Sequence, residues 1–110
     1  MSKRAGELIA AADEVCVAAI SWWELAWLAQ HDRITLAIPT RAWLAELSAQ
    51  VRTAGVTPEV AATAVGLPET FPKDPADRII YATAIESGWD LITKDQRLLD
   101  HPHPRKLAHW

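Results

Sequence analysis

The hydrophobic positions along the chain follow two different spacings, and together they predict strands alternating with helices. Compact apolar runs rich in β-branched residues, typical of buried parallel strands, occupy residues 15–19 and 91–93. Apolar residues three and four positions apart predict helices over residues 7–12, 21–30, 40–51, 57–65 and 74–87. One helical turn at 96–99 and a last strand at 107–110 complete the pattern. We therefore predict an α/β fold with a mostly parallel sheet flanked by helices.

Residues that start or stop helices occur at the expected ends of these segments. Ser21 and Glu24 have the spacing of a capping box, in which the Ser side chain caps the helix. Predicted caps of later helices are Thr40, Thr57 and Asp74, the last two followed by proline. Gly88 is expected to end the helix that Asp74 begins, and this helix carries the apolar positions Ile79, Ile80, Ala82, Ala84 and Ile85. For the helix at 57–65 we expect an apolar face of Val60, Ala61, Ala64 and Val65.

Length and composition narrow the class of protein. We expect the 110 residues to form a single domain, and the hydrophobic share of 50% excludes a disordered chain. Acidic residues interrupt every apolar run before it reaches the roughly 20 residues of a membrane span, so we expect a cytoplasmic protein. The net charge of −3 argues against binding nucleic acid through bulk positive charge, although metal ions could supply that charge at a site.

Three acidic residues are expected to meet at one edge of the predicted sheet. Glu24 follows the first strand, Asp95 follows the strand at 91–93, and Asp77 begins the helix between them. Open α/β sheets bind ligands at the carboxyl ends of their strands. Because clustered carboxylates repel one another, a bound cation such as Mg²⁺ or Mn²⁺ would relieve them, and such ions serve phosphate chemistry. Each acid taken alone is better explained by its place near a helix start, where it complements the helix dipole, and only the three together favour a site.

Four segments resemble, in order and spacing, the PIN-domain toxins of the VapC type. They are ISWWELA (20–26), DRITL (32–36), DPADRII (74–80) and LITKD (91–95). The resemblance implies a PIN-like three-layer fold and a Mg²⁺-dependent endoribonuclease of a type II toxin–antitoxin system, which hydrolyses RNA and pairs with a cognate antitoxin. By this resemblance Glu24, Asp77 and Asp95 are the catalytic and metal-binding residues. Ser21 would support the site, and Arg78 and Lys94 would contact RNA phosphates, unless these two are ordinary surface charges.

The chain departs from this family at its start, because the family's first strand and helix, with the first catalytic aspartate, are absent. We therefore expect an N-terminally truncated domain, explained by a start codon assigned too late, a truncated gene or an incomplete fragment. The strands next to the gap would have to close it or stay exposed. An alternative function is a non-catalytic module that binds an antitoxin or a full-length toxin. Trp23 and Trp27, four positions apart, share one helix face, and Trp22 lies on another; we expect one face to pack in the core and the other to form a homodimer or antitoxin contact.

Overall fold

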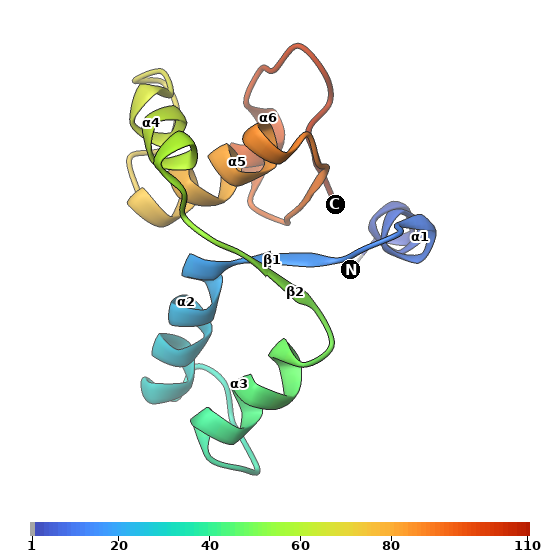
Figure 1. Cartoon of the computed structure of the whole chain (residues 1–110), viewed down its shortest axis with the longest axis vertical. Coiled ribbons are helices and arrows are strands. Elements are labelled where there is room, and N and C mark those ends of the chain that lie inside the picture. Colours follow the sequence, from blue (N-terminus) through green and yellow to red (C-terminus); the bar gives the residue numbers. More distant parts are fainter. Residues whose placement is uncertain (1) are drawn as a thin grey trace.

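The computed structural model describes residues 2–110, which alternate between helices and short strands (Figure 1). The helices are α1 (Lys3–Ala11), α2 (Ala19–Gln30), α3 (Thr40–Ser48), α4 (Pro58–Gly66), α5 (Pro75–Ser87) and α6 (Gln96–Asp100). The strands are β1 (Cys16–Ala18), β2 (Arg52–Ala54), β3 (Leu91–Ile92) and β4 (Ala108–His109). The predicted α/β class is therefore confirmed.

The ends of α4 and α5 follow the local signals in the sequence. The Thr57 hydroxyl accepts a hydrogen bond from the Val60 N–H at 3.2 Å. The Asp74 carboxylate accepts from the N–H groups of Ala76 at 2.8 Å and Asp77 at 3.3 Å. Gly88 ends α5 in the left-handed region with φ of +67°, where glycine meets no steric penalty. Caps depend on residues within one helical turn, so these predictions are confirmed.

Three other helix starts differ from the prediction. The N-cap of α2 is Ala18, which makes no side-chain cap, so Ser21 and Glu24 lie inside the helix and the predicted capping box is wrong. The helix continues directly from β1, which leaves no room for a separate capping turn. The N-cap of α3 is Pro39, and the predicted cap Thr40 is instead the first residue of this helix, so α3 has no side-chain cap. The first helix begins four residues earlier than predicted, at Lys3, because the Ser2 hydroxyl accepts from the Ala5 N–H at 3.1 Å.

The strands are parallel, as predicted, but they form two separate pairs instead of one continuous sheet. β1 pairs with β2, with Cys16 opposite Arg52 and Ala18 opposite Ala54. β3 pairs with β4, with Leu91 opposite Ala108. Neighbouring strands must lie about 4.8 Å apart to exchange backbone hydrogen bonds, and β1 and β3 make no such ladder in residues 2–110.

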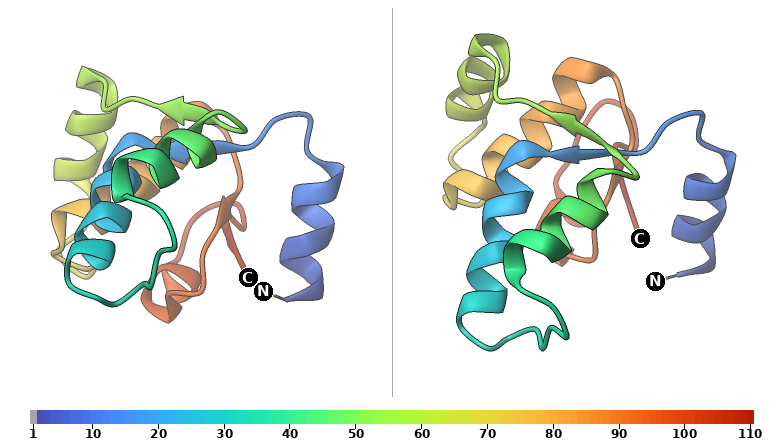
Figure 2. Two further views of the ribbon diagram at one scale, coloured as in Figure 1. Left: turned by 90° about the horizontal axis from the view of Figure 1, so that it is seen from below. Right: turned by 60° about the horizontal axis from the view of Figure 1, so that its bottom comes forward.

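A cavity of about 610 Å³ lies between the two strand pairs. Its walls include Leu8 and Ile9 from α1, Cys16 from β1, and Leu91 and Ile92 from β3. In both views of Figure 2, α1 stands apart from the other helices and is joined to β1 by an extended link. The neighbours of the predicted gap therefore stay apart, and one edge of each strand pair faces this cavity.

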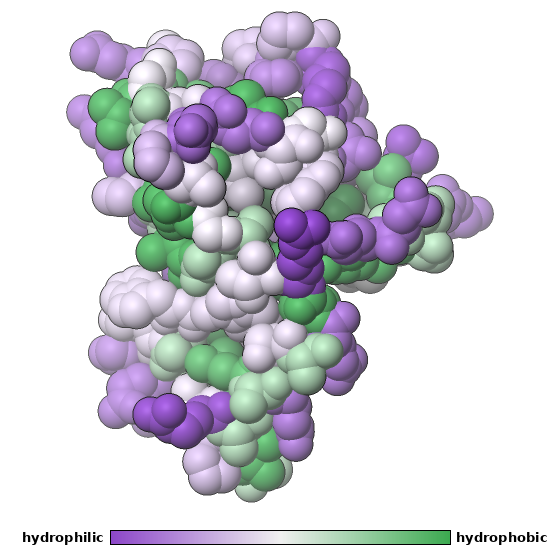
Figure 3. Space-filling model, in the orientation of Figure 1, coloured by the Kyte–Doolittle hydropathy of each residue, from purple (hydrophilic) through white to green (hydrophobic). Residues whose placement is uncertain are grey.

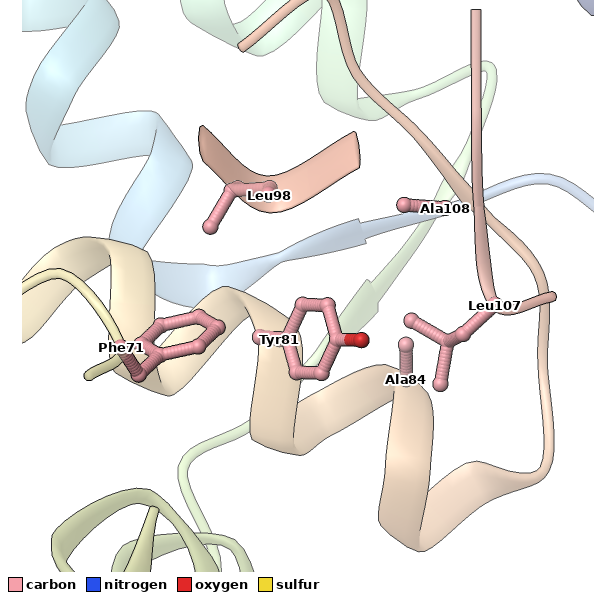
Figure 4. Packing of buried hydrophobic residues seen from close by; sticks show 6 residues of the cluster. All are labelled: Phe71, Tyr81, Ala84, Leu98, Leu107 and Ala108. Carbon is pink, nitrogen blue, oxygen red and sulfur yellow. The ribbon is translucent and has the colours of Figure 1, made fainter. Parts of the chain in front are cut away.

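The hydrophobic core lies around α5, which contacts elements from both ends of the chain. One cluster joins α5 to α6, β4 and the loop before α5, as Figure 4 shows for Phe71, Tyr81, Ala84, Leu98, Leu107 and Ala108. A second cluster packs Val60 and Ala64 of α4 against Ala82 of α5. Ala61 and Val65, predicted on the same face of α4, are exposed instead, Val65 to 83%. The apolar stripe on α4 is thus narrower than the sequence suggested.

The surface carries hydrophobic residues in several separate patches, visible on both halves of the molecule in Figure 3. Trp23 and Trp27 on α2 belong to the exposed residues, at 62% and 42% exposure. Trp22 turns to the other side of the helix, where its indole N–H donates to the Thr53 hydroxyl at 2.9 Å. Across residues 2–110, the helices are too short or too polar for any of them to cross a bilayer.

Candidate active site

The start of α5 presents Asp77 toward the space at the carboxyl ends of β1 and β3. Asp74 caps the helix with its own carboxylate, and Asp77 follows in the first helical turn with a side chain only 16% exposed. Burial is the main cause that raises the pKa of Asp77, and the negative charge of Asp74 raises it further. Arg97 and Asp95 have smaller, opposite effects on this pKa, Arg97 lowering and Asp95 raising it. The Asp77 carboxylate is therefore short of compensating positive charge.

Asp95 reaches the same space from the loop after β3. Its backbone N–H donates to the Thr93 hydroxyl at 3.1 Å, and its carboxylate caps α6 by accepting from the Arg97 N–H at 3.0 Å. The main cause that lowers the pKa of Asp95 is the hydrogen bond from the Arg97 side chain. Arg97 thus favours the ionised form of Asp95, whereas burial disfavours the ionised form of Asp77.

The Arg97 guanidinium bridges these two carboxylates. Its Nη2 lies 3.1 Å from Asp77 Oδ2 and 2.9 Å from Asp95 Oδ2, and its Nε lies 3.2 Å from Asp95 Oδ1. Residues 18 positions apart in the sequence, Asp77 and Asp95, therefore share one positive group. Sequence reasoning did not find Arg97, although its place two residues after Asp95, in the first turn of a helix, was a usable signal.

Glu24 lies on the wall of the same cavity, which has a volume of about 390 Å³. Ser21, Asp77, Thr93 and Asp95 also line this cavity. Burial is the first cause that raises the pKa of Glu24, followed by the negative charges of Asp77 and Asp74. Glu24 lies beyond the first turn of α2, so the helix-dipole explanation does not account for its position. The structure thus brings all three predicted acids to one cavity.

The donor set of this cavity consists of carboxylate oxygens, which are the ligands that Mg²⁺ and Mn²⁺ prefer. The guanidinium of Arg97 occupies the position between Asp77 and Asp95, which shows that these two acids accept a shared cation. Within residues 2–110, no three side chains of the His, Cys, Asp or Glu type are arranged to hold a metal ion. The fit is therefore to a cation held by two carboxylates, a number that suits Mg²⁺ because it retains several waters.

The Arg78 guanidinium is engaged by the protein's own backbone, which neither the predicted RNA contact nor the alternative of an ordinary surface charge anticipated. The guanidinium donates at 3.0–3.4 Å to five backbone carbonyls of the segment before α5: those of Ala64, Leu67, Pro68, Pro72 and Phe71. The side chain thereby ties the end of α4 to the start of α5. Lys94, the other cation predicted to contact phosphates, is exposed next to Asp95.

The α/β fold with three acids at the carboxyl ends of parallel strands agrees with the architecture that the family resemblance implied. The family model described as PIN domain matches residues 1–103, and the chain belongs to the PIN-domain family. The family resemblance noted in the sequence is thus confirmed.

A more specific similarity is to the protein named Ribonuclease VapC22 of Mycobacterium tuberculosis (strain ATCC 25618 / H37Rv). The two are 62% identical over 110 residues, which are 100% of this chain and 85% of that protein. This relative supports the VapC type within the family. No solved structure matches the chain significantly.

Proposed function

We propose that this protein is a Mg²⁺-dependent endoribonuclease toxin of a type II toxin–antitoxin system, which cleaves RNA in the cytoplasm. The observation that carries the proposal is that Asp77 and Asp95, from distant parts of the chain, converge on the guanidinium of Arg97. Glu24 lies on the wall of the same cavity. The name of the relative, Ribonuclease VapC22, supports RNA as the substrate class.

We propose that Asp77 and Asp95 would hold the metal directly, with Glu24, the third predicted acid, on the wall of the same cavity. When bound, a divalent cation supplies charge neutralisation and a Lewis acid for a phosphodiester. The protein's own contribution is positioning: Asp74 caps α5 and so sets the direction of its first turn, and Thr93 accepts a hydrogen bond from the Asp95 N–H. The pKa of Asp77 is raised, mainly by burial, and that of Asp95 is lowered, mainly by the Arg97 hydrogen bond, so the environments of the two carboxylates differ.

The proposal is tested by RNA cleavage with three chains: wild type, Asp77→Asn and Glu59→Gln. Glu59 is the matched control because it is also an acid in the first turn of a helix, but it is exposed on α4. We expect Mg²⁺-dependent cleavage by wild type and Glu59→Gln, abolished by EDTA, and a loss of at least about 100-fold in Asp77→Asn. Equal cleavage by Asp77→Asn at matched folding, or no cleavage by any chain, would refute the proposal.

A second candidate function is a non-catalytic module that binds an antitoxin or a full-length toxin. Two observations favour it: no three acids in residues 2–110 are placed to hold a metal ion, and Trp23 and Trp27 are exposed on one helix. Buried aromatic residues are frequent anchors of interfaces. Binding of an antitoxin or of a second copy that Trp23→Ala weakens, without any binding of Mn²⁺, would support this function. The proposed homodimer is measured in the same samples by sedimentation.

A further inference from the structure

Arg97 holds the two acids of the candidate active site together. Its Nη2 contacts Asp77 Oδ2 and Asp95 Oδ2, and its Nε contacts Asp95 Oδ1. These contacts place a delocalised positive charge between two carboxylates that would otherwise repel each other. The two carboxylates thus form a cation site, and the cation bound there is a side chain of the same protein, Arg97.

We propose that Arg97 is a removable internal cation that competes with the divalent metal for Asp77 and Asp95. This inference rests on the proposed function, because it assumes that these acids bind a metal. A divalent cation held by Asp77 and Asp95 would draw on the same two carboxylates that now accept from Arg97, and its charge would repel the guanidinium. We therefore expect the two cations to weaken each other's binding.

The surroundings of Arg97 allow this exchange. Its side chain is 62% exposed, whereas those of Asp77 and Asp95 are 16% and 29% exposed, so the cation can swing into solvent while the acids stay in place. Arg97 is on the short helix α6, and its described polar contacts are with these two acids. Arg78 differs, because its guanidinium donates to five backbone carbonyls. Arg78 is therefore a structural part of the fold, whereas Arg97 can leave its partners.

The metal affinity of a chain without Arg97 distinguishes two roles that this arginine can have. If Arg97 only strengthens the fold or pre-orders the acids, its removal lowers stability and leaves metal binding unchanged or weaker. If it competes for the acids, its removal makes the metal bind more tightly. Ion pairs of an exposed cation are individually weak, so removing two of them predicts an affinity gain of about two- to thirtyfold.

The experiment is a titration of full-length chains with Mn²⁺. Binding is measured by calorimetry and by the electron paramagnetic resonance signal of free Mn²⁺. The variants are Arg97→Gln, the matched control Arg52→Gln and the ligand control Asp77→Asn. Arg52 forms an exposed pair with Glu14, before β1, so its removal changes the net charge equally without touching the acids. We expect tighter binding in Arg97→Gln, no more than a small gain in Arg52→Gln, and a loss in Asp77→Asn.

Each outcome decides between the proposals. If wild type binds Mn²⁺, Asp77→Asn does not, and Arg97→Gln binds with unchanged or lower affinity, the competition is refuted and the proposed metal site stands. If no chain binds Mn²⁺, both proposals fail. Should Arg97→Gln not fold, Arg97→Lys decides, because a lysine keeps the charge but cannot bridge two carboxylates with a fork and should bind Mn²⁺ with intermediate affinity.

Discussion

Replacing Arg78 by methionine should destabilise the whole domain, because this side chain connects α4 to α5 through backbone carbonyls. Five carbonyl groups of residues 64–72 accept from its guanidinium at 3.0–3.4 Å. The guanidinium also lies over the ring of Phe71, 5.8 Å from the centroid, next to the main hydrophobic cluster. Methionine fills part of the volume and removes every one of these donors.

The expected decrease in the free energy of unfolding depends on how many of these carbonyls cannot reach water once the guanidinium is removed. A buried acceptor left without a partner costs about 1–3 kcal/mol, and exposed carbonyls regain hydrogen bonds to solvent at little cost. If two of the five stay buried, the free energy of unfolding falls by about 3 kcal/mol. For a domain of this size such a loss lowers the melting temperature by about 12 °C.

The assay is thermal unfolding followed by circular dichroism at 222 nm, with urea unfolding as a second measure. Arg52→Met is the control, since its arginine is exposed and pairs only with Glu14 among the described contacts, and it should melt close to wild type. Arg78→Lys should recover part of the loss, because one ammonium can reach only some of the carbonyls. A melting temperature of Arg78→Met within about 3 °C of wild type would refute the reasoning. Such a result, together with weaker RNA binding, would restore a role for Arg78 in contacting phosphates.

Three smaller perturbations test the site and the ends of α5. Glu24→Gln should raise the melting temperature at pH 7 by about 2–4 °C. Burial raises the pKa of Glu24 in the folded state, so its ionisation destabilises the fold as pH rises through that pKa, and the gain should vanish at pH 3, where the carboxyl is protonated in both states. Asp74→Ala should lower stability by about 1 kcal/mol through loss of the cap, and Asp74→Asn should retain most of it, as thermal melts can show. Gly88→Ala should cost about 1 kcal/mol through its φ of +67°, although an added Cβ meets no atom within 4 Å. The urea midpoint should fall with an unchanged m-value, and an unaltered midpoint would contradict the backbone argument.

The predictions that succeeded rest on interactions within one helical turn. The caps Thr57 and Asp74 and the stop at Gly88 could be identified from the sequence because the bonds they make join residues two to four positions apart. The capping box at Ser21 failed for a related reason: β1 runs directly into α2, and a local motif cannot reveal how the preceding residues are engaged. Local patterns determine elements best where no neighbouring element competes for the same residues.

The pairing of strands could not be predicted from their hydrophobic runs. The runs at 15–19 and 91–93 indicated buried parallel strands; the parallel direction is observed, but β1 and β3 are only half-buried. Whether the two strands join one sheet depends on the distance between elements that are remote in the sequence. The cavity between β1 and β3 is a property of that packing, and no residue pattern records it.

By itself, the sequence determined the order of the helices and of three strands, but it missed β2 (Arg52–Ala54), the partner of β1. It also determined the meeting of Asp77 with Asp95, because a helix and a returning strand of known lengths bring their ends together. Only the tertiary structure decided what the arginines do. Arg78 and Arg97 have the same chemistry and similar polar surroundings in the sequence, yet one binds backbone carbonyls and the other bridges two acids. A long flexible cation can reach partners in any direction, so its role depends on which carbonyls or carboxylates the fold places within hydrogen-bonding distance of it.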